Sequence, residues 1–279
     1  MKRREFVLGS TAFALFAGSL ARAQAPKGKR AANPFDRAAE VVGESGLPGR
    51  ELRALLLRIA EETKGRPYLV TRTKQLVAVF VHARLAARAD DVFIDWFPDT
   101  WLLTGLRGPR VAAFARGRPE FAATGGGTDV LRGDTHGAYH ACLDTSHVCP
   151  DWESVLALGR TGLAARARER RKTAANDAER LFLDCVAEVY DAMVALARRW
   201  ADVAAARGAA ACAATLREIA AHPPRTLREA LQLQFLYDRC QEAEGECVRS
   251  QGLFDRLFIR FYRADLAAGG LLLCLLRGR

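Results

Sequence analysis

The stretch TLREALQLQFLYDRC, residues 226–240, has the pattern of an amphipathic helix with a well-marked start. Thr226 and Glu229 have the spacing of a capping box, in which each side chain takes a backbone amide that the first helical turn leaves free. Pro223 and Pro224 precede the stretch and end an earlier helix, because proline has no amide hydrogen and restricts the residue before it. The stretch therefore predicts a helix that begins near residue 226.

Most of the remaining chain also has helical periodicity. Leucine and isoleucine at residues 52–59 predict a helix that Gly65-Arg66-Pro67 closes, and further helices are expected at residues 72–88 and 209–221. A long apolar stripe predicts core packing; its members are Phe182, Val186, Val189, Met193, Leu196, Trp200 and Val203. Residues 91–151 have little periodicity and are expected to be rich in loops, where functional sites tend to lie.

Length and charge narrow the class of protein. A chain of 279 residues that is 50% hydrophobic is long enough to bury a sizeable core. Its net charge of +10 comes from arginines dispersed along the helical segments, and the densest run, RARERRK at residues 166–172, is expected to be a solvated helix face. We therefore expect no nucleic-acid partner.

The N-terminus has the pattern of an export signal. A basic start precedes an apolar run at residues 13–20, which is too short for a stable membrane span, and small residues follow at Ala21 and Ala23. Residues 3–7, RREFV, resemble the twin-arginine export motif. We expect residues 1–23 to be a signal peptide, the export machinery to be a partner and the protein to be periplasmic, with a net charge of about +7 after cleavage.

The seven cysteines include no CxxC pair. Cys185 and Cys212 lie in apolar helical patterns and are expected to be buried thiols. A separate cluster combines imidazoles and thiols, the ligands that zinc prefers. It predicts a candidate metal site, although its spacing matches no standard zinc pattern; its members are His136, His140, Cys142, His147 and Cys149.

Three stretches, in order along the chain, resemble the glycyl radical enzymes of the pyruvate formate-lyase family. Residues 223–269 are similar to a family segment that contains Glu-Ala-Leu-Gln, Ser-x-Gly-Arg-x-Asp-Gln and a final Asp-Leu-x-x-Gly. Residues 146–163, SHVCPDWESVLALGRTGL, resemble a motif that begins Gly-His and ends Gly-Leu-x-Gly-Ile, and residues 62–76 resemble a shorter motif. This chain departs from the family at residues 252–256, which read GLFDR, and at Ser146.

The resemblance implies a mainly α fold, the helical N-terminal portion of a pyruvate formate-lyase-like α/β barrel with most of the barrel missing. Together with the N-terminal pattern, it predicts an export signal at residues 1–23, a linker at 24–50, a partial pyruvate formate-lyase-like domain at 51–269 and an aberrant tail, frame-shifted or otherwise truncated, at 270–279. The apolar face that carries Leu257, Phe258 and Phe261 is then expected to lack a cover. The resemblance also offers His147, Ser250 and Asp255 as substrate-binding residues, with His147 alternatively capping a helix that begins near Asp151.

The family's radical motifs, Gly-Cys-x-Glu and Arg-Val-x-Gly-Tyr, do not occur in the 279 residues. Cys240-Gln241-Glu242 imitates the first motif, but it lacks the glycine and is interpreted as a coincidence. We therefore predict a truncated exported relative of the glycyl radical enzymes, without catalytic activity alone and with no bound cofactor. An active full-length relative would carry a glycyl radical installed by a radical activase.

Two alternatives remain open. The chain is a radical-free exported protein that uses the same fold to bind a small-molecule ligand, or it is a helical protein that binds metal through residues 136–149. A homo-oligomer is compatible with each.

Overall fold

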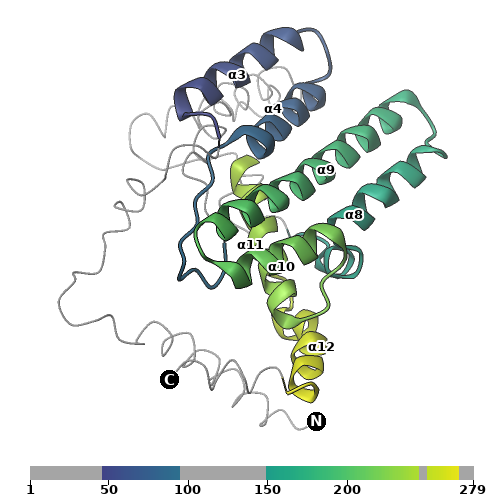
Figure 1. The fold of residues 1–279 in the computed structure, drawn as a ribbon. Coiled ribbons are helices and arrows are strands. Elements are labelled where there is room, and N and C mark those ends of the chain that lie inside the picture. The colour runs from purple at the N-terminus through teal and green to yellow at the C-terminus, as the bar shows by residue number, and fades with distance from the viewer. Residues whose placement is uncertain (1–45, 95–148, 245–249, 270–279) are drawn as a thin grey trace, which may run out of the picture. The chain divides into compact units, whose positions relative to one another are not determined.

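The computed structural model describes residues 46–94, 149–244 and 250–269, all within the compact unit formed by residues 42–279. These ranges contain seven helices and no strand, and the fold is mainly α as predicted (Figure 1). The helices are α3 (Gly49–Glu62), α4 (Tyr68–His82), α8 (Trp152–Arg171), α9 (Asp177–Ala206), α10 (Ala210–Ala221), α11 (Leu227–Glu244) and α12 (Phe254–Ala267). The expected signal peptide and tail lie outside the described residues.

The first two helices lie close to their predicted positions. α3 ends at Glu62, shortly before the expected stop at Gly65. α4 begins directly after Pro67 and ends at His82, so the prediction of a helix over residues 72–88 is wrong at both ends. Its end has a long-range cause, because the Arg199 guanidinium donates to the carbonyl oxygens of Phe80 at 2.7 Å and of Ala83 at 2.8 Å. Residue 83 then takes an extended conformation.

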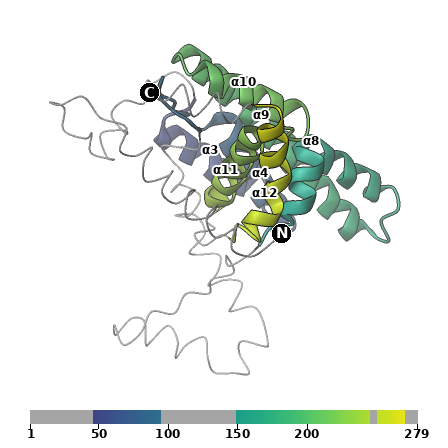
Figure 2. The same ribbon diagram turned by 90° about the horizontal axis from the view of Figure 1, so that it is seen from below.

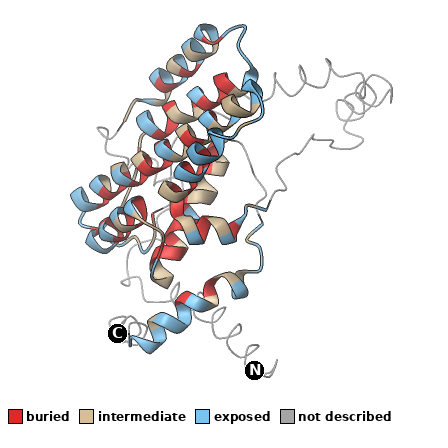
Figure 3. Cartoon of the chain, turned by 90° about the vertical axis from the view of Figure 1, so that its right-hand side faces the viewer, coloured by how far each residue is buried: buried red, intermediate tan, exposed pale blue. Residues whose placement is uncertain are grey.

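α9 is the central element, and it packs against α4, α8 and α10. Met193, Leu196 and Trp200 are buried in the core, as the apolar stripe predicted. Phe182, however, is 52% exposed, so the prediction is wrong at that end of the stripe. The connected ends of α8 and α9 extend past the other labelled helices (Figure 1), and the first turns of α9 therefore have fewer neighbours. Figure 3 shows buried residues along the helix sides that face one another.

α12 lies beside α8 and α11 (Figure 2). Arg260 donates from Nη2 to the carbonyl oxygen of Leu156 in α8 at 3.3 Å. Phe258 and Phe261 are buried in the common core, and Leu257 packs against it. The expectation that this apolar face lacks a cover is therefore wrong, because both phenylalanines are buried.

The remaining predictions concern the surface and the cysteines. The basic residues of the run at 166–172 are exposed at the end of α8, as predicted. Cys185 and Cys212 are both buried, also as predicted. Among the helices of the described ranges, none combines the length and the apolar character that crossing a membrane requires.

Candidate functional site

The start of α11 is held by the predicted capping box. The backbone amide of Glu229 donates to Thr226 Oγ1 at 3.1 Å. The Glu229 carboxylate, in return, accepts from the backbone amide of Arg225 at 2.7 Å, one residue earlier than the box predicts. A carboxylate of α12 adds to this end, because Asp265 accepts from the amide of Leu227 at 2.9 Å. Three amides at the start of the helix are thus satisfied by side chains.

Gln232, the last residue of the Glu-Ala-Leu-Gln motif, holds a distant part of the backbone. Its Oε1 accepts from the amide of Ile94 at 3.0 Å, and its Nε2 donates to the carbonyl oxygen of Ile94 at 2.7 Å. Both residues are buried. The side-chain amide of Gln232 thus pairs with the backbone amide and the backbone carbonyl of one residue, as a neighbouring strand would in a β-sheet. Gln232 therefore anchors the end of segment 92–94 on α11.

The neighbours of Gln232 reinforce this anchor. Arg228 donates from Nη2 to the carbonyl oxygen of Val92 at 2.8 Å, and its guanidinium lies 5.5 Å from the centre of the Phe93 ring. On the other side, Phe93 stacks on Phe235 with ring centroids 5.2 Å apart. One face of α11 therefore holds three consecutive residues of segment 92–94.

α8 contains an abrupt change of backbone direction at Gly159, whose φ of 60° and ψ of −177° are not helical. Pro223 packs against this glycine so closely that an added Cβ would lie 3.1 Å from the Cα of Pro223. A side chain here meets both backbone strain and a backbone contact. Gly159 thus allows α8 to approach the segment that leads into α11.

Arg160 follows this kink and is completely buried. Its Nη2 donates to the carbonyl oxygen of Ile219 at 3.1 Å, whereas Nε and Nη1 have no hydrogen-bond partner within the described residues. Burial lowers the pKa of Arg160 to about 10. The guanidinium therefore ties α8 to the end of α10 at a considerable cost in desolvation.

The predicted substrate-binding residues lie in different settings. The indole nitrogen of Trp152 donates to the Ser250 carbonyl at 2.9 Å, and Ser250 Oγ accepts from the amide of Gly252 at 3.2 Å. Asp255 is exposed in the first turn of α12, where its charge complements the helix dipole. His147 lies outside the described residues. The roles of all three in substrate binding stay predictions.

Asp151 is the N-cap residue of α8. Asp151 Oδ1 accepts from the amide of Ser154 at 3.1 Å. Hydrogen bonds from Ser154 lower the pKa of the Asp151 carboxyl below its ordinary value. The alternative role of His147 as a helix cap lies outside the described residues and stays a prediction.

Of the five residues of the predicted metal site, the structure describes only Cys149. Its thiol is exposed and donates to the carbonyl oxygen of Pro150 at 3.5 Å. His136, His140, Cys142 and His147 lie outside the described residues. Within the ranges that the structure does describe, no three His, Cys, Asp or Glu side chains gather as metal ligands. The metal site stays a prediction.

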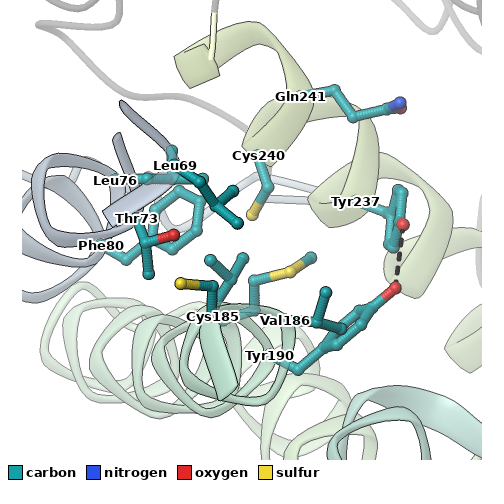
Figure 4. Close-up of a pocket in the computed structure, with 12 residues that line it drawn as sticks. Leu69, Thr73, Leu76, Phe80, Cys185, Val186, Tyr190, Tyr237, Cys240 and Gln241 are labelled. Atoms are coloured by element: carbon teal, nitrogen blue, oxygen red, sulfur yellow. Dashed lines mark hydrogen bonds between the residues drawn. The ribbon is translucent and has the colours of Figure 1, made fainter. Parts of the chain in front are cut away.

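A cavity of about 350 Å³ lies between α4, α9 and α11 (Figure 4). Apolar side chains form most of its wall, including Leu69, Leu76, Phe80, Val186 and Met193. Thr73 of α4, Cys185 of α9 and Cys240 of α11 bring a hydroxyl and two thiols to the same space. The volume falls within the range of small-molecule sites. Sequence analysis missed this site, because it forms only where three helices distant in the sequence meet.

The hydroxyls of Tyr190 and Tyr237 meet at one side of the cavity, 3.2 Å apart. Burial raises the pKa of Tyr237 above its ordinary value, and Tyr190 raises it further. Burial likewise raises the pKa of the Cys240 thiol to about 12. Both groups are therefore neutral at physiological pH, and the cavity is an uncharged site.

Comparison with known proteins agrees with these motifs. The family model described as pyruvate formate lyase-like matches residues 131–272, just over half of the chain. The isethionate sulfite-lyase of Bilophila wadsworthia (strain 3_1_6) is 33% identical over 142 residues, which cover 43% of this chain and 17% of that protein. The chain thus spans a small part of the length of this relative.

Solved structures show the same fold. A structure reported for 1,2-propanediol dehydration in Roseburia inulinivorans has a TM-score of 0.60 at 18% identity, and covers 78% of this chain and 34% of that one. A glycyl radical enzyme from Archaeoglobus fulgidus has a TM-score of 0.59 at 17% identity, with 84% and 37% covered. The fold and the family match agree, and the chain therefore belongs to the pyruvate formate lyase-like family.

Proposed function

We propose that this chain forms a helical scaffold of the kind found in glycyl radical enzymes and that it performs no radical chemistry by itself. The observation that carries the proposal is that the residues of the motifs that resemble the family make structural contacts. Gly159 allows a close helix approach, Glu229 caps α11, and Gln232 anchors Ile94. Each of these contacts organises the backbone, and none presents a reactive group to a substrate.

The cysteine motif CQE at residues 240–242 supports the same proposal. Glu242 forms an ion pair with Arg239 on its own helix, so its carboxylate serves a local contact. Burial keeps Cys240 protonated. The 279 residues contain neither Gly-Cys-x-Glu nor Arg-Val-x-Gly-Tyr, the sequences that hold the two radical positions in the family. In an active full-length relative, the glycyl radical would come from a radical activase.

The substrate of the whole protein is a separate matter. This chain resembles an isethionate sulfite-lyase, but the match covers only 17% of the length of that enzyme. Ser250 and Asp255 are proposed as the described contributors to substrate binding, together with His147, and the reaction is not carried over from any relative.

Electron paramagnetic resonance tests the proposal. The purified full chain is incubated without oxygen with S-adenosylmethionine and a reduced radical activase, and a complete glycyl radical enzyme activated by the same activase serves as the control. We expect the glycyl doublet in the control and no organic radical in this chain. A stoichiometric radical on this chain would overturn the proposal.

We also propose that the chain is exported to the periplasm by the twin-arginine route. The supporting observation is the sequence of residues 1–23, with its paired Arg3 and Arg4. Fusion of these residues to a reporter that is active only after export in the folded state should give a periplasmic signal. Replacement of both arginines with lysine should remove that signal, and its persistence would contradict the proposed route.

A further inference from the structure

The cavity between α4, α9 and α11 has an uncharged wall and three buried groups that can form hydrogen bonds. Thr73 is 5% exposed, Cys185 is 6% exposed and Cys240 is 5% exposed. In Figure 4 the hydroxyl of Thr73 and the thiol of Cys240 are directed into the space between the three helices. This arrangement places weak hydrogen-bonding groups around an apolar volume.

The Thr73 hydroxyl distinguishes this volume from an ordinary packing gap. Elsewhere in the fold, buried threonines are paired: Thr71 Oγ1 lies 2.6 Å from Thr63 Oγ1, and Thr215 Oγ1 donates to the carbonyl oxygen of Ala211 at 2.8 Å. Within the described residues, Thr73 shows no such hydrogen bond, and its side chain lines the cavity, where the hydroxyl can donate to a bound molecule. A hydroxyl that faces a cavity is satisfied when a ligand atom accepts its hydrogen.

The tyrosine pair lies at the edge of the same cavity. Two hydroxyls that share one hydrogen bond use one of their two hydrogens, so either Tyr190 or Tyr237 retains a hydrogen to donate. The lining includes no Lys, Arg, His, Asp or Glu side chain. A charged ligand would therefore be buried without a counter-charge, which is unfavourable. The wall favours a neutral molecule with an apolar body and an oxygen that accepts hydrogen bonds.

From this convergence we infer that the cavity is a binding site for a small neutral ketone, aldehyde or alcohol with an apolar chain. The ligand oxygen accepts from Thr73, and its chain lies against Leu69, Leu76 and Phe80. Binding is non-covalent, because the Cys240 thiol is protonated at neutral pH and a thiolate is the reactive form. The inference does not rest on the proposed scaffold role, since the lining of the site comes from α4, α9 and α11 of this chain.

Ligand-observed nuclear magnetic resonance tests this inference with three probes of similar size: 2-hexanone, 1-hexanol and hexanoate. The full chain should transfer saturation to the ketone and the alcohol, and competition titrations should show hexanoate at least about tenfold weaker. If neither neutral probe receives saturation, or if hexanoate binds as tightly, the inference is wrong.

Two variants test whether the probe binds in the cavity. Thr73→Val keeps the side-chain shape and removes the hydroxyl, so we expect the affinity for 2-hexanone to fall about fivefold. Thr71→Val is the matched control, because it removes a buried hydroxyl from the same helix outside the cavity lining; its affinity should be unchanged. Equal losses in the two variants would overturn the inference.

A filling substitution gives an independent check. Cys185→Phe adds volume within the cavity and should abolish binding of both neutral probes. Circular dichroism verifies that the variant is folded. Binding that persists in a folded Cys185→Phe protein would place the probe elsewhere, and the Thr73→Val result decides the inference if this variant does not fold.

Discussion

The two ends of α11 differ in how their polar groups are used. At the first end, which we call the packed end (residues 226–232), Thr226, Glu229 and Gln232 all make hydrogen bonds to backbone groups. At the second, the hollow end (residues 237–241), Tyr237 and Cys240 face a cavity, and Gln241 has a buried Oε1 without a partner among the described residues. The same helix thus combines a rigid structural joint with a space that is incompletely filled.

This difference separates the part of α11 that carries the motif resembling the family from the part that lines the cavity. The packed end coincides with the Glu-Ala-Leu-Gln motif, and its contacts position other segments of backbone. At the hollow end, Tyr237 and Cys240 line the cavity, and it is where a ligand has room. Substitutions at the two ends should therefore change different quantities: stability at the packed end and binding at the hollow end.

The largest loss of stability is expected from Gly159→Ala. Gly159 packs against Pro223, in the segment that leads into α11. A residue with φ of 60° is strained once it has a side chain, and the new Cβ also meets Pro223 at 3.1 Å. We expect the free energy of unfolding to fall by about 4 kcal/mol. Gly65→Ala is the matched control, because Gly65 has φ of 82° and nothing within 4 Å of an added Cβ. Equal losses in denaturant titrations would contradict the role of Pro223.

A smaller loss is expected from Gln232→Leu. The substitution leaves the buried amide and carbonyl of Ile94 without their partners, which should cost about 2 to 3 kcal/mol. Gln241→Leu, at the hollow end of the same helix, removes an amide whose Oε1 has no partner within the described residues, so it should cost much less. Urea titration of both variants measures the contrast. If Gln241→Leu proves as destabilising, the distinction between the ends fails.

The capping box should have a moderate effect. Thr226→Ala removes the acceptor of the Glu229 amide and should lower the free energy of unfolding by about 1 kcal/mol. Thr226→Ser retains the hydroxyl and should stay close to the unchanged protein in thermal unfolding. Similar melting temperatures for the alanine and serine variants would show that the hydroxyl has no capping role.

At neutral pH the smallest effect on stability is expected from the ionisation of Cys240, because the thiol is protonated in both states there, and the effect grows as the pH rises. Burial raises its pKa from the ordinary 9.0 to about 12, so the folded state holds this proton more tightly than the unfolded state does. The resulting contribution to stability is complete below pH 9 and is lost as the pH rises through about 12. Cys240→Ala should therefore reduce the decline in stability above pH 9.

Thiol labelling checks the same group directly. At pH 8, peptide-resolved mass spectrometry should show iodoacetamide modifying the exposed Cys149 quickly and Cys240 at least about a hundredfold more slowly. Denaturant should remove the difference. Equal labelling rates in the folded protein would contradict the burial of Cys240.

The sequence predicts the local features of this fold well. Pro67, Pro223 and the pair of Thr226 and Glu229 mark helix boundaries through short-range chemistry, and the structure has them close to the expected positions. The burial of Cys185 also follows from periodicity within one helix. Each of these signals lies within a few residues of its effect.

Other features depend on contacts between distant segments. The end of α4 is set by Arg199, more than a hundred residues later, and the anchor on Ile94 is formed by Gln232. Phe182 fits the apolar stripe, but its end of α9 has few neighbours to bury it. The cavity likewise exists only where α4, α9 and α11 meet. No local pattern contains this information.

Hydrogen–deuterium exchange at Ile94 tests the central claim, that the shared motif holds backbone in place. The amide of Ile94 donates to Gln232 Oε1, so it should be protected in the full chain and should exchange about a hundredfold faster in Gln232→Leu, with Gln241→Leu unchanged. An Ile94 amide that exchanges equally fast in all three proteins would contradict the account.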